Sequence, residues 1–211
     1  MRIAIDIDRT INNAYMYDIL NGISFMREKG KYEGMDLSKH YPKDIFNMSN
    51  TDYIEFMDTY FPKIVRSCPL KEHACEIITK LHTQHEIIIM TARDEHYSKR
   101  KYRGEYMKKD TLHWLMYKRI PYDKIKFSAF NKYHSCKELN CDVLIDDSPT
   151  HIKECADNGL PVIIMGEVYN AELKGYPNTR YTTTWNDIPL ILYMMELEKA
   201  NVHINNKWEL Y

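Results

Sequence analysis

The 211-residue sequence lacks an excess of either charge, because 29 lysines and arginines stand against 30 aspartates and glutamates, for a formal net charge of -1. No global electrostatic field therefore attracts a polyanion such as nucleic acid. Long apolar runs are also absent, since runs such as residues 87–90 are far shorter than the roughly 20 residues of a membrane helix. No signal-peptide pattern precedes the first predicted strand. We expect a cytoplasmic protein that does not span a membrane.

Cysteine is scarce and has none of the spacings typical of metal or redox sites. The five cysteines are odd in number and include no C-x-x-C pair. Reduced thiols in the core or on the surface of a cytoplasmic protein are therefore favoured over disulfides or zinc ligands. The 44% hydrophobic and 28% charged content excludes a disordered or fibrous chain, and no internal repeat or low-complexity tract is visible.

Short apolar runs alternate with helical patterns along the chain. The runs are β-branched and nearly continuous, as expected for strands covered on both faces. They occupy residues 3–7, 87–90, 125–127, 143–145 and 162–165. Strand–helix alternation of this kind predicts right-handed crossovers and a parallel sheet. The sequence therefore predicts an α/β fold with a Rossmann-like parallel sheet flanked by helices.

The first two predicted strands are separated by about eighty residues, far more than one crossover helix needs. Two helical patterns, near residues 15–29 and 52–60, lie in this gap. We predict a catalytic core formed by residues 1–12 and 71–211, and a small helical cap formed by residues 13–70 above the strand ends. A last helix is expected over residues 187–200, with Pro189 in its first turn.

Polar residues follow several of the predicted strands. Asp6 and Asp8 follow the first strand, Thr91-Ala92-Arg93 follow the second, and Asp146-Asp147 follow the fourth; Lys132 precedes the helix that leads into the fourth strand. Each alone has an ordinary explanation as a strand-end cap, a turn residue or a surface lysine. Ligands of open parallel sheets bind at the carboxyl ends of the strands, so together these residues indicate a site.

The same residues, in the same order, resemble the motifs of the haloacid dehalogenase (HAD) superfamily of phosphotransferases. The segment Asp6-Ile7-Asp8-Arg9-Thr10 resembles the first motif, Asp-x-Asp-x-Thr, and Thr91 resembles the second. Lys132 is similar to the lysine of the third motif, and Asp146-Asp147 to the acidic pair of the fourth. The helical insertion and the Leu144-Ile145-Asp146-Asp147 ending resemble the 5'(3')-deoxyribonucleotidase-type branch. The resemblance implies a HAD-like fold with a cap after the first strand.

The resemblance also implies the chemistry of the acidic residues. Asp6 is expected to attack phosphorus and form an aspartyl-phosphate. Asp8 is expected to protonate the leaving oxygen and then to deprotonate the attacking water. A Mg²⁺ ion is implied, because a carboxylate cannot approach a phosphate dianion without a cation; Asp6, the backbone carbonyl of Asp8 and Asp146 are its expected ligands. Asp147 is expected to order a water bound to the metal.

Three residues are expected to bind phosphate. The Thr91 hydroxyl and the Ala92 amide would hold a phosphate oxygen, and Lys132 would offset the charge on phosphorylated Asp6. Lys137 is a competing candidate for the lysine. Lys132 is preferred because it follows the loop of the third strand and opens the next helix.

Arg9 departs from the family pattern, which often has glycine at this position. Glycine relaxes the backbone as it leaves the strand, whereas arginine is expected to require ordinary backbone angles. Its charge is expected at the mouth of the cleft, where it either contacts substrate or points into solvent.

The insertion is rich in aromatic residues, which either stack on a nucleobase or form the core of the insertion itself. We expect a Mg²⁺-dependent phosphomonoester hydrolase that acts on nucleoside monophosphates or a similar small metabolite. The sequence leaves open whether the protein forms a homodimer. One alternative is a phosphatase of nucleic-acid ends, suggested by the basic residues within 93–109 but disfavoured by the net charge. The other is a phosphoryl- or partner-binding module without turnover. The basic residues in question are Lys99, Arg100, Lys101, Arg103 and Lys108.

Overall fold

The structure is a computed structural model that describes residues 1–94 and 105–208. Within these residues six strands form one sheet, in the order β3-β2-β1-β4-β5-β6, and every neighbouring pair is parallel. The strands are β1 (Arg2–Ile5), β2 (Glu86–Met90), β3 (Lys124–Lys126), β4 (Val143–Asp146), β5 (Val162–Met165) and β6 (Thr179–Thr182). The Rossmann-like fold class predicted from the apolar runs is confirmed.

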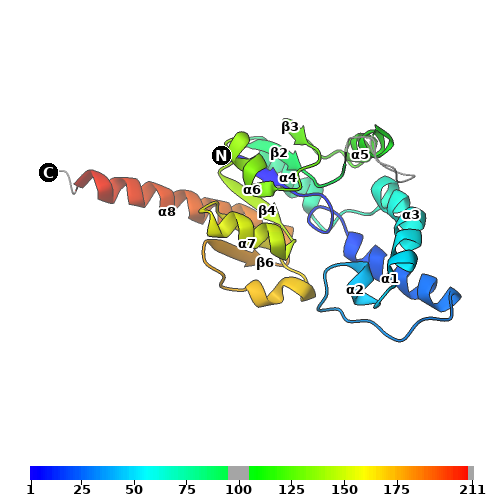
Figure 1. The fold of residues 1–211 in the computed structure, drawn as a ribbon. Helices are drawn as coiled ribbons and strands as arrows, with labels where there is room; N and C mark the ends of the chain where they lie inside the picture. Colours follow the sequence, from blue (N-terminus) through cyan, green and yellow to red (C-terminus); the bar gives the residue numbers. More distant parts are fainter. Residues whose placement is uncertain (95–104, 209–211) are drawn as a thin grey trace.

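Helices cover both faces of the sheet (Figure 1). Alternate residues of each strand point to opposite faces, so Ile3 and Ile5 pack in one core and Ala4 in the other. The flanking helices are α4 (Ala74–His82), α5 (Glu105–Tyr117), α6 (Lys132–Glu138), α7 (Pro149–Asp157) and α8 (Ile188–Trp208), and the short 3₁₀ helices are η1 (Val168–Leu173) and η2 (Trp185–Asp187).

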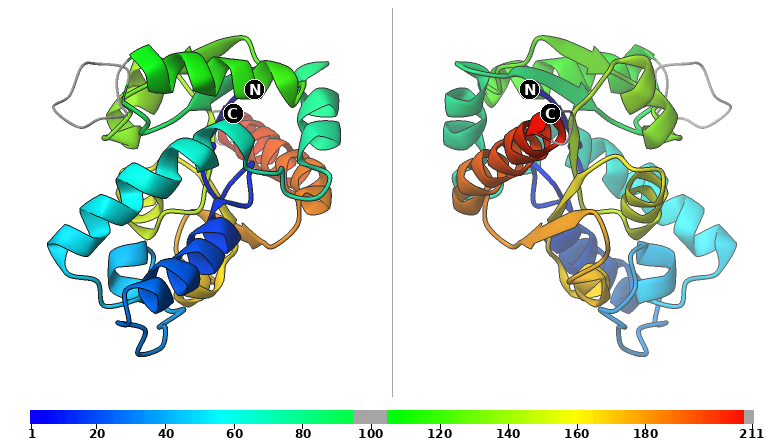
Figure 2. Two further views of the ribbon diagram at one scale, coloured as in Figure 1. Left: turned by 90° about the vertical axis from the view of Figure 1, so that its right-hand side faces the viewer. Right: turned by 90° about the vertical axis from the view of Figure 1, so that its left-hand side faces the viewer.

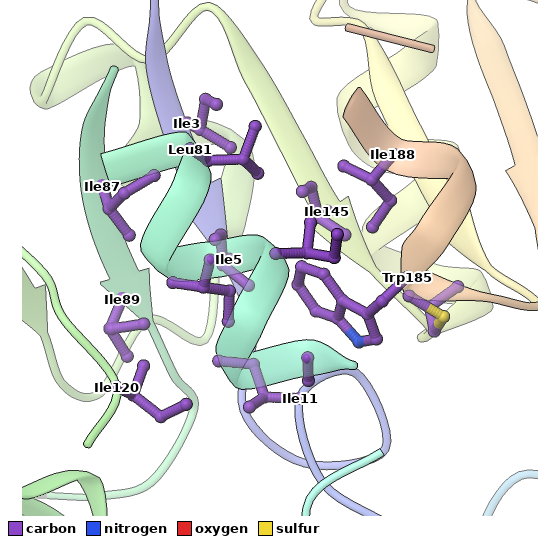
Figure 3. Close-up of a cluster of buried hydrophobic side chains, with 14 of the residues drawn as sticks. Ile3, Ile5, Ile11, Leu81, Ile87, Ile89, Ile120, Ile145, Trp185 and Ile188 are labelled. Atoms are coloured by element: carbon purple, nitrogen blue, oxygen red, sulfur yellow. The ribbon is translucent and has the colours of Figure 1, made fainter. Parts of the chain in front are cut away.

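The larger of the two cores lies between the sheet and the helices α4, α5 and α8 (Figure 3). Strand isoleucines from β1, β2 and β4 face Leu81, Trp185 and Ile188 there, and all of these side chains are at most 5% exposed. Fully burying such a side chain contributes about 1.5–3 kcal/mol. The indole of Trp185 also donates to the carbonyl oxygen of Thr10 at 3.0 Å. The core therefore supports the loop that follows β1 directly.

Three helices lie between β1 and α4, and the views in Figures 1 and 2 place them at the end of the molecule opposite to the far end of α8. They are α1 (Ala14–Glu28), α2 (Pro42–Ile45) and α3 (Asn50–Ser67). Their apolar side chains form a separate cluster, which also includes Tyr169 of η1. An isolated bridge between Asn12 and Leu70 joins the two ends of the segment. The division into core and cap at residues 13 and 70 stays a prediction.

Some elements differ from the sequence prediction. Strand β1 ends at Ile5, so Asp6 and Asp8 lie in the loop beyond it. Strand β6 has no counterpart among the predicted strands, and α3 continues through Pro62 to Ser67. None of the described helices combines the length and apolar character needed to cross a membrane. All five cysteines lie within the described residues, where they are free thiols.

Candidate active site

Asp6, Lys132 and Asp146 meet at the carboxyl end of the sheet. Asp6 follows β1 and Asp146 ends the neighbouring strand β4, while Lys132 is the first residue of α6. The Lys132 ammonium donates to Asp6 Oδ1 at 2.5 Å and to Asp146 Oδ2 at 2.8 Å. The Lys132 side chain is completely buried, so both contacts are shielded from water. The lysine chosen from the sequence lies among the predicted acids, whereas Lys137 is exposed.

Two carboxylates share the Lys132 ammonium, and a third, that of Asp147, lies close to them. Burial raises the pKa of Asp6 to about 7; Lys132 opposes the rise, and the nearby Asp146 and Asp147 add to it. The pKa of Lys132 is raised, because its two carboxylate partners outweigh its burial. With Asp6, Asp146 and Asp147 ionised, these three carboxylates and the Lys132 ammonium together carry a net charge of -2. Such a buried excess destabilises the site unless a cation balances it.

A divalent cation fits this group of residues. One carboxylate oxygen from each of Asp6, Asp146 and Asp147 lies within 4.8 Å of the others, and all three residues are buried. Hard cations such as Mg²⁺ prefer oxygen ligands and retain several waters, so few protein ligands are sufficient. The excess of negative charge and the oxygen donors therefore both match a divalent metal.

Asp147 is held by hydrogen bonds from Thr10 of the first motif and from Tyr169, which belongs to none of the motifs. Its Oδ1 accepts from the Thr10 hydroxyl at 2.9 Å, and its Oδ2 accepts from the Tyr169 hydroxyl at 2.5 Å. His40 Nε2 lies 3.5 Å from the same Oδ2. These contacts fix the carboxylate beside Asp6 and Asp146, as residues that hydrogen-bond to metal ligands commonly do.

Asp8 makes a bidentate ion pair with Arg93. Arg93 Nε donates to Asp8 Oδ2 at 2.9 Å and Nη2 donates to Oδ1 at 2.6 Å. Asn12 donates to the same Oδ1 at 3.0 Å. Burial acts to raise the pKa of Asp8, but the charge and hydrogen bonds of Arg93, with that of Asn12, hold it below its ordinary value. The two aspartates after β1 therefore occupy opposite electrostatic environments, although they are two residues apart.

Thr91 and Ala92 follow β2 and line the same cavity as Asp6 and Asp8. The Thr91 hydroxyl oxygen accepts a hydrogen bond from the Arg93 backbone N–H at 3.2 Å. Its own hydrogen is then available to a ligand in the cavity. The structure thus brings together every site residue predicted from the sequence, while their chemical roles remain predictions.

Arg9 corrects the sequence prediction in two respects. Its φ is +66°, in the left-handed region, so arginine adopts the conformation expected of glycine at this position. The residue is only 7% exposed and does not point into solvent. Its guanidinium donates to Asp18 Oδ2 at 2.6 Å and to the carbonyl oxygen of His40. The Arg9 guanidinium carbon also lies 5.6 Å from the ring centroid of Tyr15 and 5.6 Å from that of Tyr169, so both rings make cation–π contacts with its charge.

A cavity of about 300 Å³ opens above the carboxylates. Its floor is formed by the residues after β1, β2 and β4, and its apolar wall includes Tyr53, Met57 and Phe61 of α3. These three lie four residues apart, so they share one face of the helix. Phe25 and Phe56 lie in the core of the insertion, whereas Tyr53 and Phe61 line the cavity, and stacking of these two on a nucleobase stays a prediction.

Sequence reasoning missed four residues at this site. Arg93 was noted beside Thr91 but was given no role, and His40 and Tyr169 come from segments with no motif. His151 lines the cavity with Nδ1 3.5 Å from Asp146 Oδ2, and this nitrogen has no hydrogen-bond partner among the described residues. Of these four residues, only Arg93 had a signal in the sequence that could have indicated a role, namely its position two residues after Thr91 at the end of the second predicted strand. The basic residues Lys99, Arg100, Lys101 and Arg103 lie outside the described residues.

Known proteins resemble the chain in sequence and fold, although no family model matches it. A protein of Clostridium acetobutylicum named as a nucleotidase is 29% identical over 171 residues, covering 81% of this chain and 82% of its own length. A HAD-like hydrolase from Streptococcus pneumoniae has a TM-score of 0.66 at 13% identity, covering 90% of this chain and 97% of its own. A HAD-like protein of unknown function from Agrobacterium tumefaciens has a TM-score of 0.66 at 12% identity, covering 92% and 98%.

The solved structures show that the fold is HAD-like, as the order of the motifs predicted. The HAD-like fold and the sequence similarity to a protein named as a nucleotidase both agree with the resemblance predicted from the motifs.

Proposed function

We propose that the protein is a Mg²⁺-dependent phosphomonoester hydrolase that acts on nucleoside monophosphates through an aspartyl-phosphate on Asp6. The observation that carries the proposal is the meeting of Asp6, Lys132 and Asp146 beneath a cavity whose wall is apolar and aromatic. The charged floor suits a phosphate with its cation. The wall suits the base or sugar of a small ligand.

The reaction has two displacements. In the first, a carboxylate oxygen of Asp6 attacks phosphorus, the bond from phosphorus to the leaving oxygen breaks, and Asp8 gives that oxygen a proton. Arg93 keeps Asp8 ionised before the substrate binds, so Asp8 takes up this proton from the phosphate monoanion that binds beside it. In the second, a water oxygen attacks the phosphorus on Asp6, gives its proton to Asp8, and releases inorganic phosphate. Lys132 offsets charge on the phosphorylated Asp6 throughout.

Asp6, Asp146 and the Asp8 backbone carbonyl would hold the Mg²⁺ ion, with Asp147 as a further ligand or as the partner of a bound water. When bound, the ion neutralises phosphate oxygens and so lowers the repulsion between phosphate and carboxylate. The Thr91 hydroxyl and the Ala92 amide would hold a phosphate oxygen at the opposite side of the floor.

The proposed substrate is a small molecule, because the cavity lies under α3 and is near the lower end of the volume range of small-molecule pockets. The relative from Clostridium acetobutylicum is named as a nucleotidase, which supports a nucleotide. A phosphorylated polynucleotide end is the competing substrate, and it has no comparable support among the described residues.

A phosphate-release screen tests the proposal. The purified protein is incubated with nucleoside 5'- and 3'-monophosphates, sugar phosphates, p-nitrophenyl phosphate and a 5'-phosphorylated oligonucleotide, with Mg²⁺ or with EDTA. We expect Mg²⁺-dependent release that is fastest from a mononucleotide and is lost in Asp6→Asn. Fastest release from the oligonucleotide would refute the substrate class. Phosphate release by Asp6→Asn at the wild-type rate would refute the nucleophile.

A further inference from the structure

Arg93 holds both oxygens of the Asp8 carboxylate. Its Nε and Nη2 donate to Oδ2 at 2.9 Å and to Oδ1 at 2.6 Å, and the arginine side chain is 1% exposed. A planar guanidinium that binds a carboxylate through two parallel hydrogen bonds fixes its rotation as well as its position. The ammonium of lysine supplies a single point of charge and does not impose this orientation.

Arg93 is itself anchored on two sides. Its Nη1 donates to the Thr111 hydroxyl of α5 at 3.1 Å, and its backbone N–H donates to the Thr91 hydroxyl at 3.2 Å. Thr111 is completely buried, so the anchor is shielded from solvent. One residue therefore connects the loop after β2, the helix α5 and the aspartate after β1.

We propose that Arg93 is the positioning residue that aims the Asp8 carboxyl at the leaving oxygen of the substrate. The inference rests on the proposed function, and it concerns the proton transfer of that reaction. As the bond from phosphorus to the leaving oxygen breaks, this oxygen keeps the electron pair and takes the proton of Asp8. The resulting Asp8 carboxylate keeps its two hydrogen bonds from Arg93. The attacking water later returns a proton to the same oxygen of Asp8.

The role predicts a dependence on the leaving group. An alkoxide is a poor leaving group and requires the proton of Asp8, whereas p-nitrophenolate leaves readily without it. A misaimed Asp8 should therefore slow the hydrolysis of alkyl phosphates far more than that of p-nitrophenyl phosphate. A merely structural ion pair would lower both rates by the same factor, because it would change only the amount of folded enzyme.

The experiment compares kcat and KM of Arg93→Lys and wild type on p-nitrophenyl phosphate and on the best alkyl phosphate of the screen. For the alkyl phosphate we expect kcat to fall about 100-fold, within the usual contribution of a general acid, with KM nearly unchanged. For p-nitrophenyl phosphate we expect a fall of about 5-fold or less. Adding Arg93→Lys to Asp8→Asn should slow the reaction no further, since residues that act as a unit are not additive.

Arg180→Lys is the matched control. Arg180 of β6 also donates to both oxygens of a carboxylate, that of Glu198, at 2.9 and 2.7 Å, but this pair is exposed and does not line the cavity. The control should leave the ratio of the two rates unchanged. Thr111→Val removes only the Nη1 anchor and retains Arg93, and it should shift the ratio in the same direction by a smaller factor if Arg93→Lys fails to fold.

Equal losses on the two substrates, or a loss confined to KM, would refute the positioning role while leaving the proposed function intact. A wild-type protein that releases phosphate from neither substrate would refute the proposed function and this role with it.

Discussion

Replacing Asp6 by asparagine should stabilise the metal-free protein at pH 8. The pKa of Asp6 is about 7 in the folded protein, against 3.8 for an ordinary aspartate, so above pH 7 folding keeps a carboxylate ionised in a site that disfavours it. The shift is about 3 units, and at 1.36 kcal/mol per unit it costs about 4 kcal/mol at most. Because Asp6→Asn also removes one partner of Lys132, we expect a net gain of about 2–4 kcal/mol.

The sign of the pH dependence follows from proton linkage. A group whose pKa is raised by folding stabilises the folded state fully below its unfolded pKa, and the contribution is lost as the pH rises through the folded value. The advantage of Asp6→Asn should therefore shrink by roughly half at pH 5.5. The stability difference between Asp6→Asn and wild type should change mainly between about pH 4 and pH 7, the ordinary and the folded pKa of Asp6.

Thermal unfolding in EDTA, followed by circular dichroism, measures this effect. For a chain of this length the gain corresponds to a melting temperature roughly 5–12 °C higher at pH 8. Asp52→Asn is the control with the opposite sign, because hydrogen bonds from Lys31, Ser49 and Lys29 lower the pKa of Asp52, and its loss should destabilise the protein. If Asp6→Asn melts below wild type at pH 8, or if its advantage is the same at both pH values, the charge argument is wrong.

Three further predictions concern single residues. Asp8→Asn should lower kcat on alkyl phosphates about 100-fold or more while inorganic phosphate still inhibits the variant, and an unchanged kcat would contradict the acid–base role. Lys132→Ala should cost far more activity than Lys137→Ala, because of the two lysines Lys132 is the one that contacts Asp6 and Asp146; the reverse order in a phosphate-release assay would overturn the assignment. Arg9→Gly should gain about 1 kcal/mol at a positive φ but lose about 3–5 kcal/mol by leaving Asp18 buried without its partner, so chemical unfolding should show a less stable variant. A more stable Arg9→Gly protein would show that the ion pair contributes little.

The central strands and the floor of the site were predictable because the signals that define them are local. Continuous β-branched runs identified β1, β2, β4 and β5, and the polar residues that interrupt or follow them identified the floor. Strand β6 was missed because its sequence, Thr-Arg-Tyr-Thr, has no apolar run, as an edge strand with a single neighbour permits. The length of α3 was missed because Pro62 usually ends a helix.

What the sequence did not predict is pairing between distant segments. The contact of Arg93 with Asp8 joins residues 85 positions apart, and that of Tyr169 with Asp147 joins an η1 residue to the end of β4. No periodicity encodes such contacts, since each depends on where two elements meet in space. The backbone of Arg9 was mispredicted for a related reason, because contacts with Asp18, His40 and two tyrosines hold it in a conformation that arginine alone disfavours.

The joined ends of the segment that carries α1 to α3 have a consequence for how such enzymes diversify. Asn13 N–H donates to the carbonyl oxygen of Pro69 at 2.9 Å, and Lys71 N–H donates to that of Ile11 at 2.8 Å, so the chain leaves the sheet and returns to it at one place. For the strands of the sheet, residues 13–70 therefore act like a short turn. Because the entropic cost of closing a loop grows slowly with its length, a longer or shorter segment would change the stability of the sheet only slightly. The segment from residue 13 to residue 70 is in this sense interchangeable, and a graft from another protein of this fold could alter which molecules enter the cavity while the residues of its floor stay in place.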